Sequence, residues 1–181
     1  RLLDREHLSH ARPACGAGRP IIGIDSSQDM LAKAREKLKR QGMTRAHEFV
    51  CADLNRGVQV TNASVVIMTL TLQFIRPLYR HALIKSIAGG MNDQGCLILI
   101  EKVLPRDSML NRLFIKYCYA FKKRQGYSTM EIAQKREALE NVLVPYRIQE
   151  NVDLLQRNGF TAAEPFFRWY NFASFIALKP A

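Results

Sequence analysis

The chain has 181 residues, of which 48% are hydrophobic and 24% are charged, and its formal net charge is +11. This length and composition are typical of a single globular domain, and no apolar run approaches the roughly 20 residues that a membrane-spanning helix needs. The positive charge favours an anionic partner such as a nucleotide, an acidic metabolite or RNA. Many of the cations, however, fall at the ends of predicted helices, where they complement the helix dipole. We therefore expect no membrane segment and no direct nucleic-acid contact.

The cysteines and histidines form no metal-binding or disulfide pattern. The cysteines are scattered without a Cys-x-x-Cys pair, and the histidines lack the spacing of a metal site or a catalytic triad. We expect no metal and no disulfide framework, and this cysteine usage favours a reducing, cytoplasmic location. The residues concerned are Cys15, Cys51, Cys96, Cys118, His7, His10, His47 and His81.

Apolar runs of strand length alternate with longer stretches of helical period in the first part of the chain. Ser26 and Asp29 match a capping box that opens the first helix, and Gly42 follows its end. This alternation predicts an α/β fold with a doubly wound, mostly parallel sheet of the Rossmann type. The predicted strands are 21–24, 48–51, 63–69 and 96–101, and a helix over 78–88 precedes a break at Gly89-Gly90.

Two helices follow one another after Pro105 and form a predicted helical insertion at about 106–145. Ser128 and Glu131 form a capping box for the second helix. The first helix carries an apolar stripe that is a candidate homodimer surface, although core packing would explain it as well. The stripe consists of Leu110, Leu113, Phe114, Tyr117 and Phe121. A helix over 148–157 and two antiparallel strands at 160–167 and 169–178 complete the predicted sheet.

Polar residues that follow the predicted strands are the first functional candidates, because ligands of open α/β sheets bind beyond the carboxyl ends of the strands. Asp25 ends the first strand, where a carboxylate can accept hydrogen bonds from the hydroxyls of a ribose; helix capping is the alternative. Asp53 follows the second strand, where its carboxylate and the Leu54 amide can meet an adenine ring; an Asx turn is the alternative. Thr69 ends the third strand and faces the same crevice.

Arg136 is the most informative single residue. Helical spacing places it between Ile132 and Leu139, with Leu143 on the same predicted inward stripe. An arginine on a buried face needs an anion, and its planar guanidinium can bind a carboxylate with two hydrogen bonds. The alternative is a structural ion pair, for example with Glu140.

Several short segments of the chain resemble the carboxy-S-adenosyl-methionine synthase family. The resemblance extends from about Pro20 to Lys179 and implies a class I methyltransferase fold. It also implies that S-adenosyl-methionine and prephenate give carboxy-S-adenosyl-methionine and phenylpyruvate, through capture of carbon dioxide by a sulfonium ylide. The product would serve a tRNA carboxymethyltransferase that modifies a wobble uridine. The segments are Ile21-Ile22-Gly23-Ile24-Asp25-Ser26-Ser27, Leu70-Thr71-Leu72-Gln73-Phe74, Gly126-Tyr127-Ser128, Gln134-Lys135-Arg136, Leu139-Glu140-Asn141-Val142, Asn171-Phe172 and Ala177-Leu178-Lys179.

The resemblance assigns a role to each candidate residue. Asp25 and Ser26 match the pair that binds the ribose, and Asp53 and Leu54 match the pair that binds the adenine. Arg136 matches the arginine that holds the transferred carboxylate, and it is the expected catalytic residue. A cofactor contact is also expected at Thr69, where the family has an asparagine. A homodimer is also expected, and the sequence leaves open whether Arg136 serves its own subunit or a neighbouring one.

The family pattern also contains a first strand and a Gly-rich cofactor loop ahead of the residues that match Asp25. Residues 1–19 show no trusted match, and Gly16-Ala17-Gly18 precedes a strand instead of following one. We therefore expect residues 20–181 to be a truncated S-adenosyl-methionine-binding domain that binds its cofactor poorly and is inactive without the upstream segment. Two alternatives stay open: a conventional methyltransferase acting on RNA or a small molecule, and a non-enzymatic module for RNA binding or dimerisation.

Overall fold

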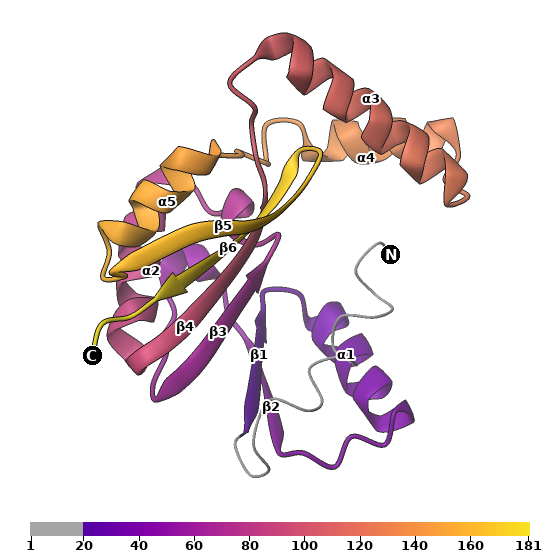
Figure 1. Ribbon diagram of the computed structural model, residues 1–181. Helices are drawn as coiled ribbons and strands as arrows, with labels where there is room; N and C mark the ends of the chain where they lie inside the picture. Colours follow the sequence, from indigo (N-terminus) through magenta and orange to yellow (C-terminus); the bar gives the residue numbers. More distant parts are fainter. Residues whose placement is uncertain (1–19) are drawn as a thin grey trace. The chain divides into compact units, whose positions relative to one another are not determined.

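The computed structural model describes residues 20–181 (Figure 1). The chain forms two compact units, of which the first ends at Asp53 and the second comprises Leu54–Ala181. The tripeptide Gly16-Ala17-Gly18, together with Cys15, His7 and His10, lies outside the described residues. Each unit is described by itself.

The first unit contains a strand–helix–strand motif. β1 (Ile21–Asp25) and β2 (His47–Cys51) are parallel neighbours, and α1 (Gln28–Arg40) connects them. The N-cap of α1 is Ser27, whose hydroxyl accepts from the Met30 amide at 3.3 Å, so the predicted cap at Ser26 was wrong by one residue. Because the Asp25 side chain binds the Ser27 backbone amide, the chain turns one residue later than the capping-box pattern predicts.

The second unit is built on a four-stranded sheet with the order β3-β4-β6-β5. The strands are β3 (Ala63–Thr69), β4 (Met91–Lys102), β5 (Ala162–Trp169) and β6 (Phe172–Leu178). β3 and β4 are parallel, whereas β6 is antiparallel to both β4 and β5. The fold is α/β as predicted, but the sheet of this unit is mixed, because its last two strands form a hairpin at one edge.

The core of the second unit lies between this sheet and two helices, α2 (Pro77–Gly90) and α5 (Ile148–Gln156). Figure 1 shows the two helices next to each other beside the sheet. Residues that alternate along β4 and β6 face them and are fully buried, including Leu97, Leu99 and Phe175. The break predicted at Gly89-Gly90 is the end of α2 itself. A side chain at Gly90 would overlap the backbone of Val60.

Two helices, α3 (Ser108–Arg124) and α4 (Thr129–Leu139), lie between β4 and α5 in the sequence, at the position of the predicted insertion. Ser128 and Glu131 form the predicted capping box of α4. Gly126 separates the helices with a φ of 89°, a left-handed conformation that favours glycine. α3 is anchored to the β5–β6 hairpin by aromatic rings, among them Phe121 and Trp169 at a centroid distance of 4.9 Å.

Each sheet has an unpaired strand edge among the residues that the structure describes. β1 pairs only with β2, and β3 pairs only with β4. None of the helices from residue 20 onward is long and apolar enough to cross a membrane.

Candidate functional site

Asp25 and Asp53 lie near the same edge of the two-stranded sheet. In the parallel register Asp25 is opposite Cys51, and the Ala52 amide donates to the Asp25 carbonyl at 3.1 Å. Asp53 therefore follows the strand end after one intervening residue, not directly as the sequence suggested. The structure thus places Asp25 and Asp53, the residues predicted to bind the ribose and the adenine, at the same end of the two-stranded sheet.

The Asp25 carboxylate is partly engaged in its own turn. Its Oδ1 accepts from the Ser27 amide at 2.8 Å, which orients the side chain at the entrance of α1. The side chain is half-buried, and Oδ2 accepts no hydrogen bond from the described residues. Ser26 is exposed beside it, and its carbonyl accepts from the Cys51 thiol at 3.6 Å. Both the capping interpretation and the ligand interpretation are therefore compatible with this geometry.

Leu54 and Thr69 are positioned by elements of the second unit. Leu54 begins a short 3-10 helix, η1 (Leu54–Arg56), directly after the exposed Asp53. Thr69 is half-buried at the carboxyl end of β3, and its carbonyl accepts from the Thr71 hydroxyl at 3.0 Å. The next residue, Leu70, has a φ of 52°, so the backbone turns sharply directly after Thr69.

The turn after Thr69 is held by a buried carboxylate, that of Glu101. This residue lies near the carboxyl end of β4, next to β3. Its Oε1 accepts from the amides of Thr71 at 3.0 Å and Leu72 at 2.8 Å, and its Oε2 accepts from the Gln73 amide at 3.0 Å. These amides begin the 3-10 helix η2 (Leu72–Phe74), whose N-cap residue, Thr71, provides no side-chain cap. Glu101 thus caps η2 from the neighbouring strand.

Gln73 and Arg80 extend this buried network toward the segment that follows α4. The Gln73 side chain donates to the Leu70 carbonyl at 3.4 Å and accepts from the Lys102 amide at 3.2 Å. The Arg80 guanidinium donates to the carbonyls of Ile75 at 2.8 Å, Gln73 at 3.3 Å and Val144 at 2.7 Å. It also lies 4.2 Å from the centre of the Tyr146 ring.

The electrostatics of this network are set by burial. Removal from water raises the pKa of the Glu101 carboxyl to about 7, although the three backbone amides and the nearby Arg80 guanidinium favour its ionised form. The ionised carboxylate is the form suited to accept hydrogen bonds from three amides at once. Because burial opposes ionisation more than these partners favour it, the contribution of Glu101 to stability is expected to fall as pH rises through 7.

Arg136 does not occupy the inward position that the sequence predicted. It is exposed on α4, and its side chain makes no hydrogen bond or ion pair within residues 20–181. The inward stripe is shorter than predicted, because Ile132 is buried but α4 ends at Leu139, before Leu143. The structural alternative of an ion pair with Glu140 does not form within residues 20–181 either.

Sequence reasoning did not identify Glu101, Gln73 or Arg80 as residues that shape the site. The signal for Glu101 was present, because it is an acid at the end of an apolar strand, as Asp25 is. Arg80 lies among apolar helix positions, but periodicity reveals neither its partners in the turn before α2, the carbonyls of Ile75 and Gln73, nor its distant partner, the carbonyl of Val144. No cluster of metal-ligating residues occurs in the described part of the chain, and its three cysteines are free thiols.

Comparison with known proteins shows which proteins this chain is similar to. Residues 7–95 match the family model for a methyltransferase domain. A carboxy-S-adenosyl-L-methionine synthase of Methylococcus capsulatus is 53% identical over 162 residues, which are 90% of this chain and 67% of that protein. The synthase of Nitratiruptor sp. is 45% identical over 88% of this chain and 65% of its own length. That of Desulfotalea psychrophila is 41% identical over 99% of this chain and 69% of its own length.

Solved structures support the same fold. YcgJ of Bacillus subtilis superposes with a TM-score of 0.63 at 10% identity, covering 88% of this chain and 82% of that protein. The S-adenosylmethionine-dependent methyltransferase SibL gives a TM-score of 0.62 at 12% identity, over 90% of this chain and 43% of that protein. At this identity the likeness establishes the fold alone. The chain spans about two thirds of the length of its curated relatives, and over that span it belongs to the carboxy-S-adenosyl-L-methionine synthase family.

Proposed function

We propose that this chain is the major part of an enzyme that converts S-adenosyl-methionine and prephenate to carboxy-S-adenosyl-methionine and phenylpyruvate. The observation that carries the proposal is the 53% identity to a carboxy-S-adenosyl-L-methionine synthase. The paired strand ends at Asp25 and Asp53 support it, since a nucleoside cofactor needs acceptors at such an edge. S-adenosyl-methionine is a substrate in this reaction, and the chain's own residues bind and orient it.

The Asp25 carboxylate is suited to the ribose. Its Oδ1 is held by the Ser27 amide, so the side chain has one orientation, while Oδ2 can accept from a hydroxyl of the ligand. Ser26 is exposed at the same turn and is the second proposed ribose contact. At the next strand end, Asp53 would accept from the adenine amino group, and the Leu54 amide would meet a ring nitrogen. A fixed acceptor lowers the ordering cost of binding.

Thr69 and Arg136 are the proposed contacts of the reacting end. The network centred on Glu101 fixes the backbone around Thr69, so that a cofactor contact there is preorganised. The Arg136 guanidinium is exposed and makes no hydrogen bond to the described residues, so it is available to bind a carboxylate. In that role it would hold carbon dioxide near the carbon that becomes carboxylated and stabilise the new carboxylate.

A product assay tests this proposal. The 181-residue chain, and a version extended by the in-frame residues encoded upstream of Arg1, are incubated with S-adenosyl-methionine, with and without prephenate. We expect the extended version to form the carboxylated product only when prephenate is present, with little turnover by the shorter chain. Mass spectrometry detects the carboxylated product and phenylpyruvate. Formation of S-adenosyl-homocysteine with a methylated acceptor would instead establish a conventional methyltransferase, and an inactive extended protein would contradict the proposal.

The role of Arg136 has its own test. Arg136→Ala should reduce carboxylated product at least about 100-fold, because one charge-assisted, two-point contact to the transferred group is lost. Binding of S-adenosyl-methionine, measured by calorimetry, should change little. Lys135→Ala is the matched control, since it removes a neighbouring exposed cation from the same helix. Equal losses in the two variants would reduce the role of Arg136 to general surface charge.

The partners and the location belong to the same proposal. We propose a homodimer that uses the apolar stripe of α3, where Leu110 is 46% and Tyr117 is 50% exposed. The product would be consumed by a tRNA carboxymethyltransferase, and the three free cysteines support a reducing, cytoplasmic location.

A further inference from the structure

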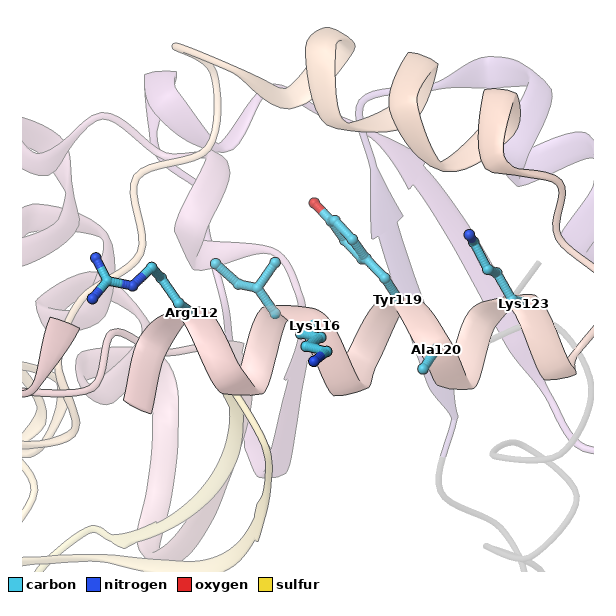
Figure 2. A pocket seen from close by; sticks show the side chains of 6 residues that line it. Arg112, Lys116, Tyr119, Ala120 and Lys123 are labelled. Atoms are coloured by element: carbon cyan, nitrogen blue, oxygen red, sulfur yellow. The ribbon is translucent and has the colours of Figure 1, made fainter. Parts of the chain in front are cut away.

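One side of α3 presents cations around an aromatic ring. Six residues of this helix line a shallow hollow of about 480 Å³. Figure 2 shows them in place along the helix, with the side chains of Tyr119 and Lys123 extending to the same side. The hollow is lined by Arg112, Ile115, Lys116, Tyr119, Ala120 and Lys123, which we call the basic face.

The basic face is geometrically separate from the apolar stripe of the same helix. With 3.6 residues per turn, Arg112 and Lys123 fall on the side of the helix opposite to Leu110 and Tyr117, and Lys116 lies about 100° around the helix from Tyr117. Arg112 and Lys123 are about 16 Å apart along the axis, at 1.5 Å per residue. α3 can therefore use its two sides for two different partners.

The charge on this helix is unbalanced. Residues 108–124 contain the cations Arg112, Lys116, Lys122, Lys123 and Arg124 and no acidic residue. Arg112, Lys116 and Lys123 are exposed, while Tyr119 is half-buried between them. Lys122 adds a further positive charge beside the ring, with its Nζ 5.7 Å from the ring centre. A second copy of the same face would be repelled, so this side is a poor homodimer surface.

The basic face is also held firmly in place. On the other side of α3, the ring centre of Phe114 lies 6.3 Å from that of Tyr170. The Tyr117 ring stacks on the Tyr170 ring with 6.1 Å between the ring centres. Phe121 meets Trp169 edge to face at 4.9 Å. These contacts tie the helix to the β5–β6 hairpin, so its cations are displayed on a rigid element.

We propose that the basic face binds single-stranded RNA, with Arg112, Lys116 and Lys123 contacting phosphates and Tyr119 stacking on a base. An extended polyanion fits better than a small anion, because the cations are spread along the helix and do not converge on one point. The aromatic ring favours RNA over an acidic peptide, since a cation-flanked ring is the usual platform for an unpaired base. This activity goes beyond the synthase reaction and does not require it.

This inference departs from the expectation of no direct nucleic-acid contact. That expectation rested on cations at helix C-terminal ends, where the helix dipole accounts for them. Arg112 lies in the second turn of α3 and Lys116 at its midpoint, and a cation gains nothing from the helix dipole at either position. Their position requires another explanation, and both line the same hollow as Tyr119 and Lys123.

Fluorescence anisotropy with a labelled RNA of about 12 nucleotides, a length within the usual site size for single strands, tests the proposal without cofactor or substrate. The triple variant R112E/K116E/K123E should bind at least about ten-fold more weakly. The slope of log K against log salt concentration should decrease in magnitude by about 2, since each of the three phosphate contacts contributes about 0.7 to that slope. K33E/R76E/K85E is the matched control, because it makes the same charge change at exposed positions of other helices. An equal loss in this control, or no binding by the original chain, would overturn the proposal.

Tyr119→Leu distinguishes RNA from other polyanions. It should weaken RNA binding at least about five-fold, the lower end of the usual stacking contribution, and leave inorganic polyphosphate binding unchanged. Circular dichroism and Trp169 emission confirm that the variants are folded. If Tyr119→Leu leaves RNA binding unchanged, or if polyglutamate or anionic lipid vesicles bind more tightly than RNA, the basic face is not an RNA site. None of these readouts depends on the proposed synthase activity.

Discussion

Two carboxylates that follow strands in this chain differ in environment and therefore in use. Asp25 is half-buried. One of its carboxylate oxygens accepts a hydrogen bond from the Ser27 amide, and the other can accept one from a ligand. Glu101 is 2% exposed, and both of its oxygens accept from backbone amides. A carboxylate with all of its partners inside the protein organises the site and does not bind a ligand. Glu101 is therefore a positioning residue for the turn after Thr69.

The first prediction concerns the pH dependence of stability at Glu101. Its pKa in the folded chain is raised from 4.5 to about 7. The folded state therefore holds this proton more tightly than the unfolded state, and the stabilising contribution, fully present below pH 4.5, is lost as pH rises through 7. We expect the free energy of unfolding of the original chain, relative to Glu101→Gln, to fall by about 3 kcal/mol between pH 4 and pH 8.

Urea denaturation of both proteins across this pH range measures the difference. The other titrating groups are common to the two proteins and largely cancel. A difference that stays constant with pH would mean that burial does not raise the pKa of Glu101, because the three amides and Arg80 fully offset the loss of water.

The second prediction concerns Arg80. Its guanidinium is 1% exposed and binds three carbonyl groups from two separate turns. Arg80→Leu keeps much of the volume but leaves those carbonyls without their donor, so we expect a loss of about 3 kcal/mol in the free energy of unfolding. Arg76→Leu at the start of the same helix is the control. Because Arg76 is exposed, this substitution should lower the free energy of unfolding by less than about 0.5 kcal/mol. Similar losses for the two variants in urea denaturation would contradict the assigned role.

At the scale of elements, the third prediction concerns the contact between α3 and the β5–β6 hairpin. Trp169 is the single tryptophan of the chain, and the centre of its ring lies 4.9 Å from the ring centres of both Phe121 and Tyr170. Phe121→Ala removes the α3 side of this contact. An aromatic pair of this kind stabilises the fold by about 1 kcal/mol in addition to the effect of burying its apolar surface. The emission of Trp169 should shift to longer wavelength as water reaches the ring. Met130→Ala, at a 70% exposed position of α4, should leave the emission unchanged. An unshifted spectrum for Phe121→Ala would show that α3 is held by other contacts.

The elements themselves were largely predictable, but their packing was not. The strand at 63–69, the capping box at Ser128 and the antiparallel final pair were all confirmed, because local periodicity and capping chemistry determine them. The inward orientation of Arg136 was wrong, since periodicity shows which side of a helix is apolar and not how much of it another element covers. The network of Glu101 and Arg80 joins residues far apart in sequence, which no local pattern encodes.

At the scale of the whole molecule, the four-stranded sheet has one buried face and one face that is only partly covered. α2 and α5 cover the face that contains Leu97 and Leu99. On the opposite face Val65 is 48% and Ile67 is 60% exposed. Both residues lie on β3, the strand whose outer edge is unpaired within residues 20–181. An apolar face of this kind is normally covered by further chain or by a partner.

Two exposed apolar surfaces therefore compete as the homodimer interface: the stripe of α3 and the open face of β3. The stripe is the better candidate, because it lies on a helix outside the sheet and includes Leu110 and the exposed ring of Tyr117. Leu110→Lys should lower the association constant at least about ten-fold, by placing a charge in an apolar contact. Ile67→Lys, an equal change at a comparably exposed position, should not. Light scattering coupled to size-exclusion chromatography at several concentrations measures both variants. If Ile67→Lys alone gives monomers, the dimer forms through the open sheet, and a monomeric original chain would exclude both surfaces.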